Sequence, residues 1–343
     1  MKNLKRFLCV VLGLMLCLVA VSFGACDNEP KASDAVDADV YAPDGAPALA
    51  LAQLMKEEMQ FSGSVRYHVV AATTIQTYVT GEDPQAELCV IPVNAAAQLL
   101  GSGEKYVMLG TVTHGNIYIL SNTEKTPLTA DNLDTLIGKV VGSIQLTNVV
   151  GLTLRLVLEQ NDIAYTIIED VSQKKDDVVN IINIPDPATM ITGTANFDYM
   201  VAAEPVVSTK TGAIATLEVV GDLQELYGEG GYPQAVLVAK ADFAEKNEQF
   251  IQDFIQAVEE NAAWIMADST EPATIVDAVA SHLPEGSTPT FKTANLTKGV
   301  IENCAIRFQS AIDSKEEVKS FLSKLSGVSN VQYNVADSFF YSA

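Results

Sequence analysis

Eight polar side chains stand where predicted strands end or predicted helices begin. In α/β folds such positions gather at one rim, where short polar side chains meet the unpaired N–H groups of helix N-termini. Neutral donors of this kind can hold a small anion without a formal positive charge, and they can equally hold a neutral heterocycle. We expect ligand binding at Asp44, Thr73, Thr74, Asn94, Gln145, Thr147, Asn148 and Glu204.

The sequence contains little that indicates an enzyme. The three histidines, His68, His114 and His282, lie far apart and lack the His-x-x-x-His spacing of a zinc site. Neither Gly-x-Ser-x-Gly nor the phosphate-binding Gly-x-x-x-x-Gly-Lys run occurs. We therefore predict no catalytic residue, no metal and no cofactor, and we interpret His114 as an exposed loop histidine rather than a titrating site group.

Several of the eight residues have an ordinary structural interpretation as well. Thr73, Thr74, Thr147 and Asn148 can equally be helix caps, each of which stabilises a helix by about 1 kcal/mol without touching a ligand. Asp44 and the following glycine form a common turn dipeptide. The sequence leaves both interpretations open.

The N-terminus has the organisation of a secretory signal. Lys2, Lys5 and Arg6 precede an apolar run over residues 7–23, and small residues lead to Cys26. Residues 18–26 resemble the lipobox of bacterial lipoproteins, with Phe23 in place of the usual leucine. The resemblance implies removal of residues 1–25, lipidation of Cys26 and attachment to the extracytoplasmic face of the bacterial cell membrane. An ordinary secreted protein and an uncleaved anchor are the alternatives.

Composition excludes nucleic acid as a partner. The 343-residue chain has a formal net charge of −22, and loss of residues 1–25 would change it to −25. Nucleic-acid binding depends on neutralising phosphates with a basic surface, which this sequence lacks. Beyond the signal and Cys26, Cys89 and Cys304 remain, and two buried free thiols are favoured over a disulfide between them.

The elements that must position the polar residues alternate between strand and helix. Residues 26–39 are polar and acidic and predict a disordered tether. A helix is expected over residues 48–59, and residues 106–121 predict one or two strands interrupted at residues 114–116. Residues 314–317 predict a capping box ahead of an apolar helix stripe. Further strands are expected at 66–72, 87–91, 139–143, 178–184, 199–203 and 234–240, with helices at 95–100, 150–160 and 251–265.

Five segments carry a family resemblance when taken in order: residues 43–48, 80–89, 136–142, 197–205 and 233–243. The fourth, Phe197-Asp198-Tyr199-Met200-Val201-Ala202-Ala203-Glu204-Pro205, matches the family's Asp-Ala-x-x-x-x-Glu-Pro strand ending. On these segments the chain resembles the solute-binding proteins of ABC importers of the nitrate/taurine/thiamine-precursor (NitT/TauT) type. The resemblance covers nearly all of the chain after the signal.

This resemblance implies the type II periplasmic-binding-protein fold, which is α/β with two lobes. Each lobe is a mixed sheet flanked by helices, and two hinge strands join the lobes. We expect residues 40–120 and 232–343 in lobe 1 and residues 121–231 in lobe 2. The implied function is that of a monomeric extracytoplasmic subunit that captures a small molecule between the lobes and delivers it to the permease. A sensor subunit of the same fold and an enzyme of cofactor biosynthesis are the alternatives.

The ligand class stays open. Relatives that hold sulfonates or nitrate often use a basic side chain, whereas Arg66, Arg155 and Arg307 all lie outside the predicted rim loops. The pattern favours a small organic molecule of low or negative charge. For a flat heterocycle, the candidate aromatic partners are Tyr41, Tyr78, Tyr118 and Tyr232.

Overall fold

The computed structural model describes residues 36–184, 197–228 and 230–342. The chain divides into two units, Met1–Val36 and Asp37–Ala343, and all elements below belong to the second. The predicted signal, Cys26 and most of the predicted tether lie outside the described residues. None of the helices in the described ranges is long and apolar enough to cross a membrane.

Within these ranges the first of two six-stranded sheets has the order β12-β4-β11-β3-β1-β2. Strand β1 pairs in parallel with β2 and β3, whereas β11 pairs antiparallel with β3 and β4, and β12 with β4. The sheet is therefore mixed. Its strands are β1 (Asp37–Pro43), β2 (Ser64–Val70), β3 (Leu88–Pro92), β4 (Tyr106–Thr113), β11 (Ala235–Lys240) and β12 (Ile306–Ser310).

The second sheet has the order β10-β5-β9-β6-β8-β7. Strand β6 pairs in parallel with β8 and β9, and β5 pairs antiparallel with β9 and β10. Its strands are β5 (Ile117–Ser121), β6 (Val140–Ile144), β7 (Tyr165–Ile168), β8 (Val179–Ile184), β9 (Tyr199–Ala203) and β10 (Glu218–Asp222). The prediction of two mixed α/β sheets is confirmed.

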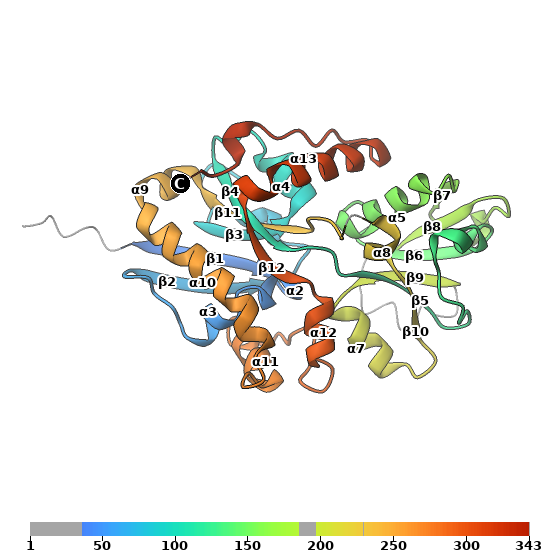
Figure 1. Cartoon of the computed structure of the whole chain (residues 1–343), viewed down its shortest axis with the longest axis horizontal. Coiled ribbons are helices and arrows are strands. Elements are labelled where there is room, and N and C mark those ends of the chain that lie inside the picture. Colours follow the sequence, from blue (N-terminus) through green and yellow to red (C-terminus); the bar gives the residue numbers. More distant parts are fainter. Residues whose placement is uncertain (1–35, 185–196, 229, 343) are drawn as a thin grey trace, which may run out of the picture. The chain divides into compact units, whose positions relative to one another are not determined.

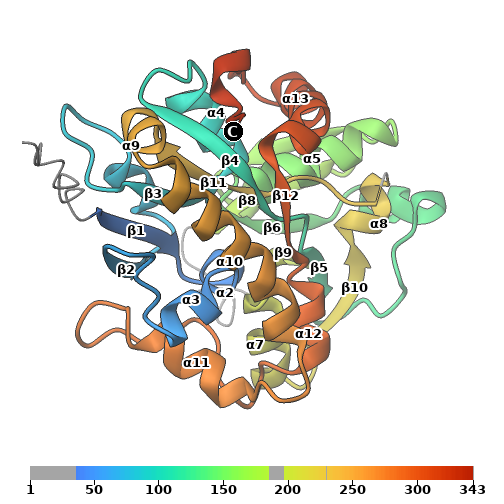
Figure 2. The same cartoon turned by 60° about the vertical axis from the view of Figure 1, so that its left-hand side comes forward.

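Helices cover both sheets (Figure 1). On the first sheet, α4 (Val93–Leu100) and α13 (Ala311–Val328) lie on one side; α3 (Ala52–Lys56), α10 (Glu248–Met266) and α11 (Pro272–Ala280) pack together on the other (Figure 2). The second sheet carries α5 (Val149–Gln160), α7 (Val206–Ala213) and α8 (Leu223–Tyr227). We call each sheet with its helices a lobe. The remaining helices are α2 (Ala46–Leu49), α9 (Ala241–Lys246) and α12 (Lys298–Asn303), with 3-10 turns at η1 (Ile75–Tyr78), η2 (Ala130–Leu136), η3 (Val171–Gln173) and η5 (Asp337–Phe339).

In the described part of the chain, two segments connect the sheets: residues 114–116 between β4 and β5, and residues 231–234 ahead of β11. The two segments run close together. The N–H of Gln234 in the second segment donates to the carbonyl of Thr113, the last residue of β4 before the first segment, at 2.9 Å. The first crossing lies a few residues before the predicted limit of lobe 1 at residue 120. The interruption predicted at residues 114–116 is thus the point where the chain changes sheet.

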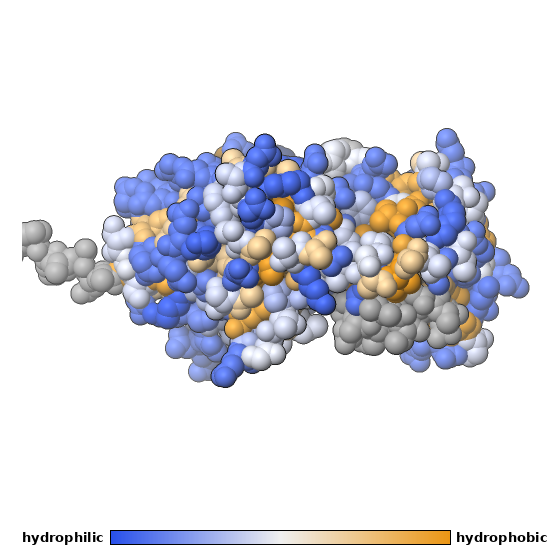
Figure 3. Space-filling model, turned by 90° about the horizontal axis from the view of Figure 1, so that it is seen from below, coloured by the Kyte–Doolittle hydropathy of each residue, from blue (hydrophilic) through white to orange (hydrophobic). Residues whose placement is uncertain are grey.

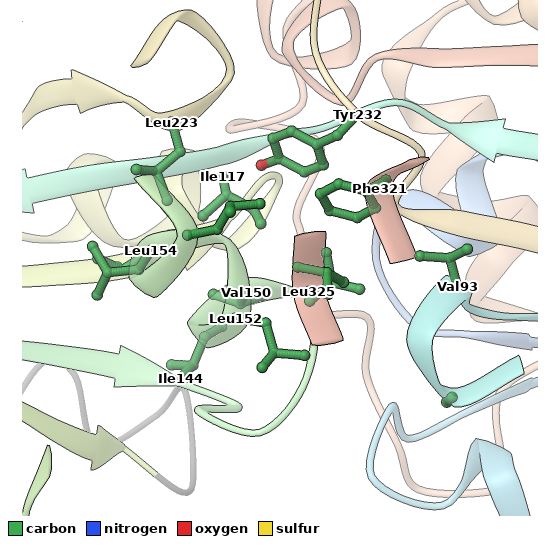
Figure 4. Close-up of a cluster of buried hydrophobic side chains, with 14 of the residues drawn as sticks. Val93, Ile117, Ile144, Val150, Leu152, Leu154, Leu223, Tyr232, Phe321 and Leu325 are labelled. Atoms are coloured by element: carbon green, nitrogen blue, oxygen red, sulfur yellow. The ribbon is translucent and has the colours of Figure 1, made fainter. Parts of the chain in front are cut away.

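One apolar cluster extends through both lobes. Figure 4 shows α13 of the first lobe beside α5 of the second, with Leu325 and Leu152 in the contact. Phe321 of α13 stacks on Tyr232 of the second crossing, with ring centroids 5.1 Å apart. The lobes are therefore joined by apolar packing as well as by the crossings.

Two local predictions were wrong, and three strands were missed. The helix expected over residues 48–59 is two short helices, α2 and α3, because Leu51 has non-helical angles (φ −119°, ψ 12°). The capping box expected at residues 314–317 lies inside α13, whose N-cap is Ser310; its hydroxyl accepts from the Asp313 N–H at 3.1 Å. Strands β7, β10 and β12 were not predicted; β7 and β12 carry few buried residues.

Much of the surface is hydrophilic. On the face in Figure 3, apolar residues form small patches among hydrophilic ones. Cys89 and Cys304 are buried free thiols, as predicted.

Candidate ligand cavity between the lobes

A cavity of about 500 Å³ lies between the two lobes, a volume typical of small-molecule sites. The first lobe contributes the turn after β1, residues 71–73 after β2, and Thr290. The second lobe contributes the turns after β6 and β9, and both crossings contribute a residue each, Asn116 and Gln234. Residues distant in sequence thus converge on one space.

Asp44 is held in place on the first-lobe wall. β1 ends at Pro43, and the following Gly45 has φ +120°, a conformation that favours glycine. The Asp44 carboxylate accepts from the Thr290 N–H at 2.9 Å and from the Thr290 hydroxyl at 3.3 Å. Burial raises the pKa of the Asp44 carboxyl, and the bonds from Thr290 oppose that shift.

Glu204 occupies the matching position on the second-lobe wall. It follows β9 directly, is 4% exposed, and accepts from the N–H and hydroxyl of Ser208 at 2.9 and 2.7 Å. Asn116 donates from its side-chain Nδ2 to the backbone carbonyl of Glu204 at 3.2 Å. The backbone carbonyl of Asn116 in turn accepts from the Glu204 N–H at 2.8 Å. Burial raises the pKa of the Glu204 carboxyl as well.

The two acidic turns, one from each lobe, approach each other closely. A Cβ placed on Gly45 would lie 4.0 Å from Cδ of Pro205, the residue after Glu204. Thr209 on α7 donates from its hydroxyl to the carbonyl of Thr290 at 3.2 Å. The residue that holds Asp44 is therefore itself hydrogen-bonded to the helix that follows Glu204.

Helix α5 presents its N-terminus to the same space. Asn148 is the N-cap residue, and its side chain accepts from the Val149 N–H at 3.0 Å. Gln145, at the turn between β6 and α5, has φ +49°. Val149 and Val150, in the first turn of α5, line the cavity.

The structure brings together five of the eight predicted residues. Asp44, Thr73, Gln145, Asn148 and Glu204 line the cavity. Asn94 and Thr147 instead line a neighbouring space of about 480 Å³, which Asn148 also borders. Thr74 is exposed and lines neither, because its hydroxyl turns back to donate to the Ala71 carbonyl at 3.0 Å. The alternative interpretation as helix caps holds for Asn148, which caps α5. It does not hold for Thr74, whose side chain makes no capping hydrogen bond to η1.

A sequence model described as NMT1/THI5 like matches residues 73–272, more than half of the chain. The chain belongs to the NMT1/THI5-like family. No curated protein matches the sequence.

Solved structures agree on the fold of this NMT1/THI5-like protein. An ABC transporter structure from Parabacteroides distasonis has a TM-score of 0.66 at 18% identity, covering 89% of this chain and 98% of that one. The periplasmic aliphatic sulphonate-binding protein SsuA from Escherichia coli has a TM-score of 0.60 at 14% identity, with 89% and 92% covered. The periplasmic nitrate-binding protein NrtA from Synechocystis PCC 6803 has a TM-score of 0.57 at 13% identity, with 85% and 81% covered. The predicted two-lobed type II fold is confirmed.

Two predictions about ring-bearing side chains were wrong for this NMT1/THI5-like protein. His114 is 1% exposed rather than a solvated loop residue, because the first crossing is packed inside the molecule. Its Nε2 lies 2.8 Å from the Thr111 hydroxyl, and burial lowers the pKa of His114 to about 3. None of the described residues lining the cavity is aromatic.

The four candidate tyrosines have other partners. Tyr41 stacks on His68 and Tyr78, and Tyr232 stacks on Phe321. Tyr118 donates to the Asn303 carbonyl at 3.5 Å, the limit of a hydrogen bond. These side chains belong to the packing of the lobes.

Sequence reasoning missed Asn116, Gln234 and Thr290. Asn116 lies in the interruption between two predicted strands, and Gln234 follows Tyr232-Pro233. Each residue therefore lies at a break in the strand pattern that the sequence shows. Thr290 had none, since it comes from the segment between α11 and α12 and reaches Asp44 only through the tertiary structure. Among the described residues, no group of three His, Cys, Asp or Glu side chains is arranged to hold a metal ion.

Proposed function

We propose that this protein is the solute-binding subunit of an ABC importer, which captures a small molecule between its lobes and delivers it to a permease. The observation that carries the proposal is the cavity, whose wall is built from both lobes and from both crossings. Membership of the NMT1/THI5-like family and the shared fold with SsuA and NrtA support it.

The mechanism follows from which residues lie on which lobe. Asp44 and Thr73 approach a ligand from the first lobe, and Gln145, Asn148 and Glu204 from the second. A ligand that contacts both lobes favours the closed form by the difference in its affinity for the two forms. The crossings at residues 114–116 and 231–234 are the segments that absorb such a movement. We propose capture and release without a chemical step.

Filling the cavity tests this function. We expect purified protein incubated with a bacterial small-molecule extract to retain one solute in native mass spectrometry, and we expect Ala72→Trp to abolish retention. Ala72 is half-buried in the cavity wall, so an indole there would occupy the solute's space. Thr74→Trp is the matched control, because Thr74 lies two residues away and outside the cavity; it should retain the solute. Equal retention by both variants would contradict the proposal.

We further propose that Cys26 carries a lipid and holds a monomeric protein on the extracytoplasmic face of the membrane. The basic N-terminus, the apolar run and the small residues before Cys26 support this location. We expect Cys26→Ala to lose lipid labelling and to leave the membrane fraction or remain unprocessed. Cys89→Ala, which removes a buried thiol, should remain lipidated. Unchanged labelling of the Cys26 variant would overturn the assignment.

A further inference from the structure

Two carboxyl side chains stand among the residues that line the cavity. Asp44 belongs to the first lobe and Glu204 to the second; the Asp44 carboxylate accepts from Thr290 and from the Gly45 backbone, and each Glu204 carboxylate oxygen accepts from Ser208. A carboxylate offers about four acceptor positions, so each carboxylate keeps capacity for a donor from a ligand. One buried and one half-buried acidic residue thus line the cavity where the proposed function places the solute.

A third acceptor has no partner at all. Asn116 is only 1% exposed, and its side-chain oxygen has no hydrogen-bond partner among the described residues. Its amide orientation is defined, because Nδ2 donates to the Glu204 carbonyl at 3.2 Å and leaves Oδ1 as the free atom. The Gln234 side-chain oxygen is likewise buried without a partner. Both unpaired oxygens belong to the crossings that border the cavity, but each atom is closed off from solvent, so we assign neither of them a bond to the ligand.

No basic side chain offsets the carboxylates. None of the described residues that line the cavity is lysine, arginine or histidine. Residues 185–196, which the structure does not describe, contain no basic residue in the sequence. The opposing feature is the N-terminus of α5, which is equivalent to about half a positive charge. The first N–H of α5 already donates to the Asn148 side chain. The negative charge of two carboxylates therefore exceeds the partial positive charge of this helix end.

We propose that the cavity takes a small neutral or cationic molecule with at least one N–H donor group, and that it discriminates against anions such as sulfonates and nitrate. This inference rests on the proposed function and specifies its ligand class. A cationic or amide N–H would bond to the carboxylates, whereas an anion would lie beside two like charges. Ile144, Val149, Val150 and Val206 give the ligand's carbon skeleton aliphatic walls.

Matched probes with one carbon skeleton test the ligand class. We would titrate cyclohexylmethylamine, cyclohexanecarboxamide and cyclohexylmethanesulfonate into the purified protein by calorimetry, with nitrate as a fourth probe. We expect the amine or the amide to bind at least about 10-fold more tightly than the sulfonate and nitrate, since hydrogen bonds to charged groups are the strong ones. Equal or tighter binding of the sulfonate or of nitrate overturns the proposal.

Isosteric variants then assign the effect to the two carboxylates. Asp44→Asn and Glu204→Gln should each weaken binding of the amine about 10-fold or more and should reduce the discrimination against the sulfonate. Asp134→Asn is the control, because Asp134 is an exposed carboxylate outside the cavity; it should bind like the parent. If a cavity variant fails to fold, the comparison of probes on the parent protein still decides.

The outcomes separate this inference from the proposed function. Tight binding of the sulfonate overturns the ligand class and leaves a solute-binding subunit. Failure of all four probes at millimolar concentration also overturns the ligand class as stated, and retention of a solute in the extract experiment then still supports the function. Failure of the probes together with absence of any retained solute overturns both.

Discussion

Replacing Gly231 with alanine will destabilise the protein by about 2–4 kcal/mol. Gly231 has φ +106°, which side-chain-bearing residues rarely adopt, and an added Cβ would lie 2.6 Å from the carbonyl oxygen of His114. That oxygen belongs to the first crossing and Gly231 to the second, so relief of the clash must separate the two connections. Urea denaturation of the purified variant measures the change in the free energy of unfolding.

The neighbouring glycine provides the control. Gly230 also has a positive φ, +76°, but apart from its chain neighbours no atom of the described residues lies within 4 Å of a Cβ placed there. Gly230→Ala should therefore lower the free energy of unfolding only by the cost of the backbone conformation, about 1–2 kcal/mol. If the two variants lose the same stability, close approach of the crossings is not what requires glycine at residue 231.

The Phe321→Ala variant should lose about 3–5 kcal/mol, the cost of removing a buried aromatic side chain and leaving a cavity. Phe321 is 1% exposed, stacks on Tyr232, and meets Tyr227 of α8 edge-on at 5.8 Å. Figure 4 shows Phe321 directed from α13 toward Tyr232, beside the second-lobe residues of the same cluster. The loss should appear in urea denaturation as one transition at lower urea, because both lobes share this apolar cluster.

Ile312→Ala on the same helix is the matched control. Ile312 is 53% exposed, so its truncation should change stability by less than about 0.5 kcal/mol. A separate early transition for one lobe in the Phe321 variant would show that the lobes unfold independently, contrary to the shared cluster.

The sequence determined most strands of both sheets because their signals are local. Short runs rich in apolar residues predicted β3, β6, β8, β9 and β11, and the apolar stripe of α13 is buried as expected at Val318, Phe321, Leu322 and Leu325. It also predicted five cavity residues, since Asp44, Thr73, Gln145, Asn148 and Glu204 all follow a strand within a few residues. In parallel pairs such as β1–β2 and β6–β9, the carboxyl ends of the strands lie at the same edge.

Tertiary structure alone decided what surrounds those residues. Thr290 reaches Asp44 across 246 positions of sequence, and no local pattern encodes such a contact. His114 and Tyr232 look like loop residues in sequence, yet both are buried because the crossings run through the packed junction of the lobes. Asn94 and Thr74 sit beside strand ends like the others, but the direction of each side chain is set by the helix or turn that holds it.

The charge of the cavity also belongs to the tertiary structure. The sequence favoured a ligand of low or negative charge, because short polar residues and helix N-termini are local features that suit an anion. Folding brings Asp44 and Glu204, which lie 160 residues apart, into the lining of one cavity with no basic side chain among the described lining residues. Electrostatic energy depends on distances in space and on burial, and sequence separation specifies neither.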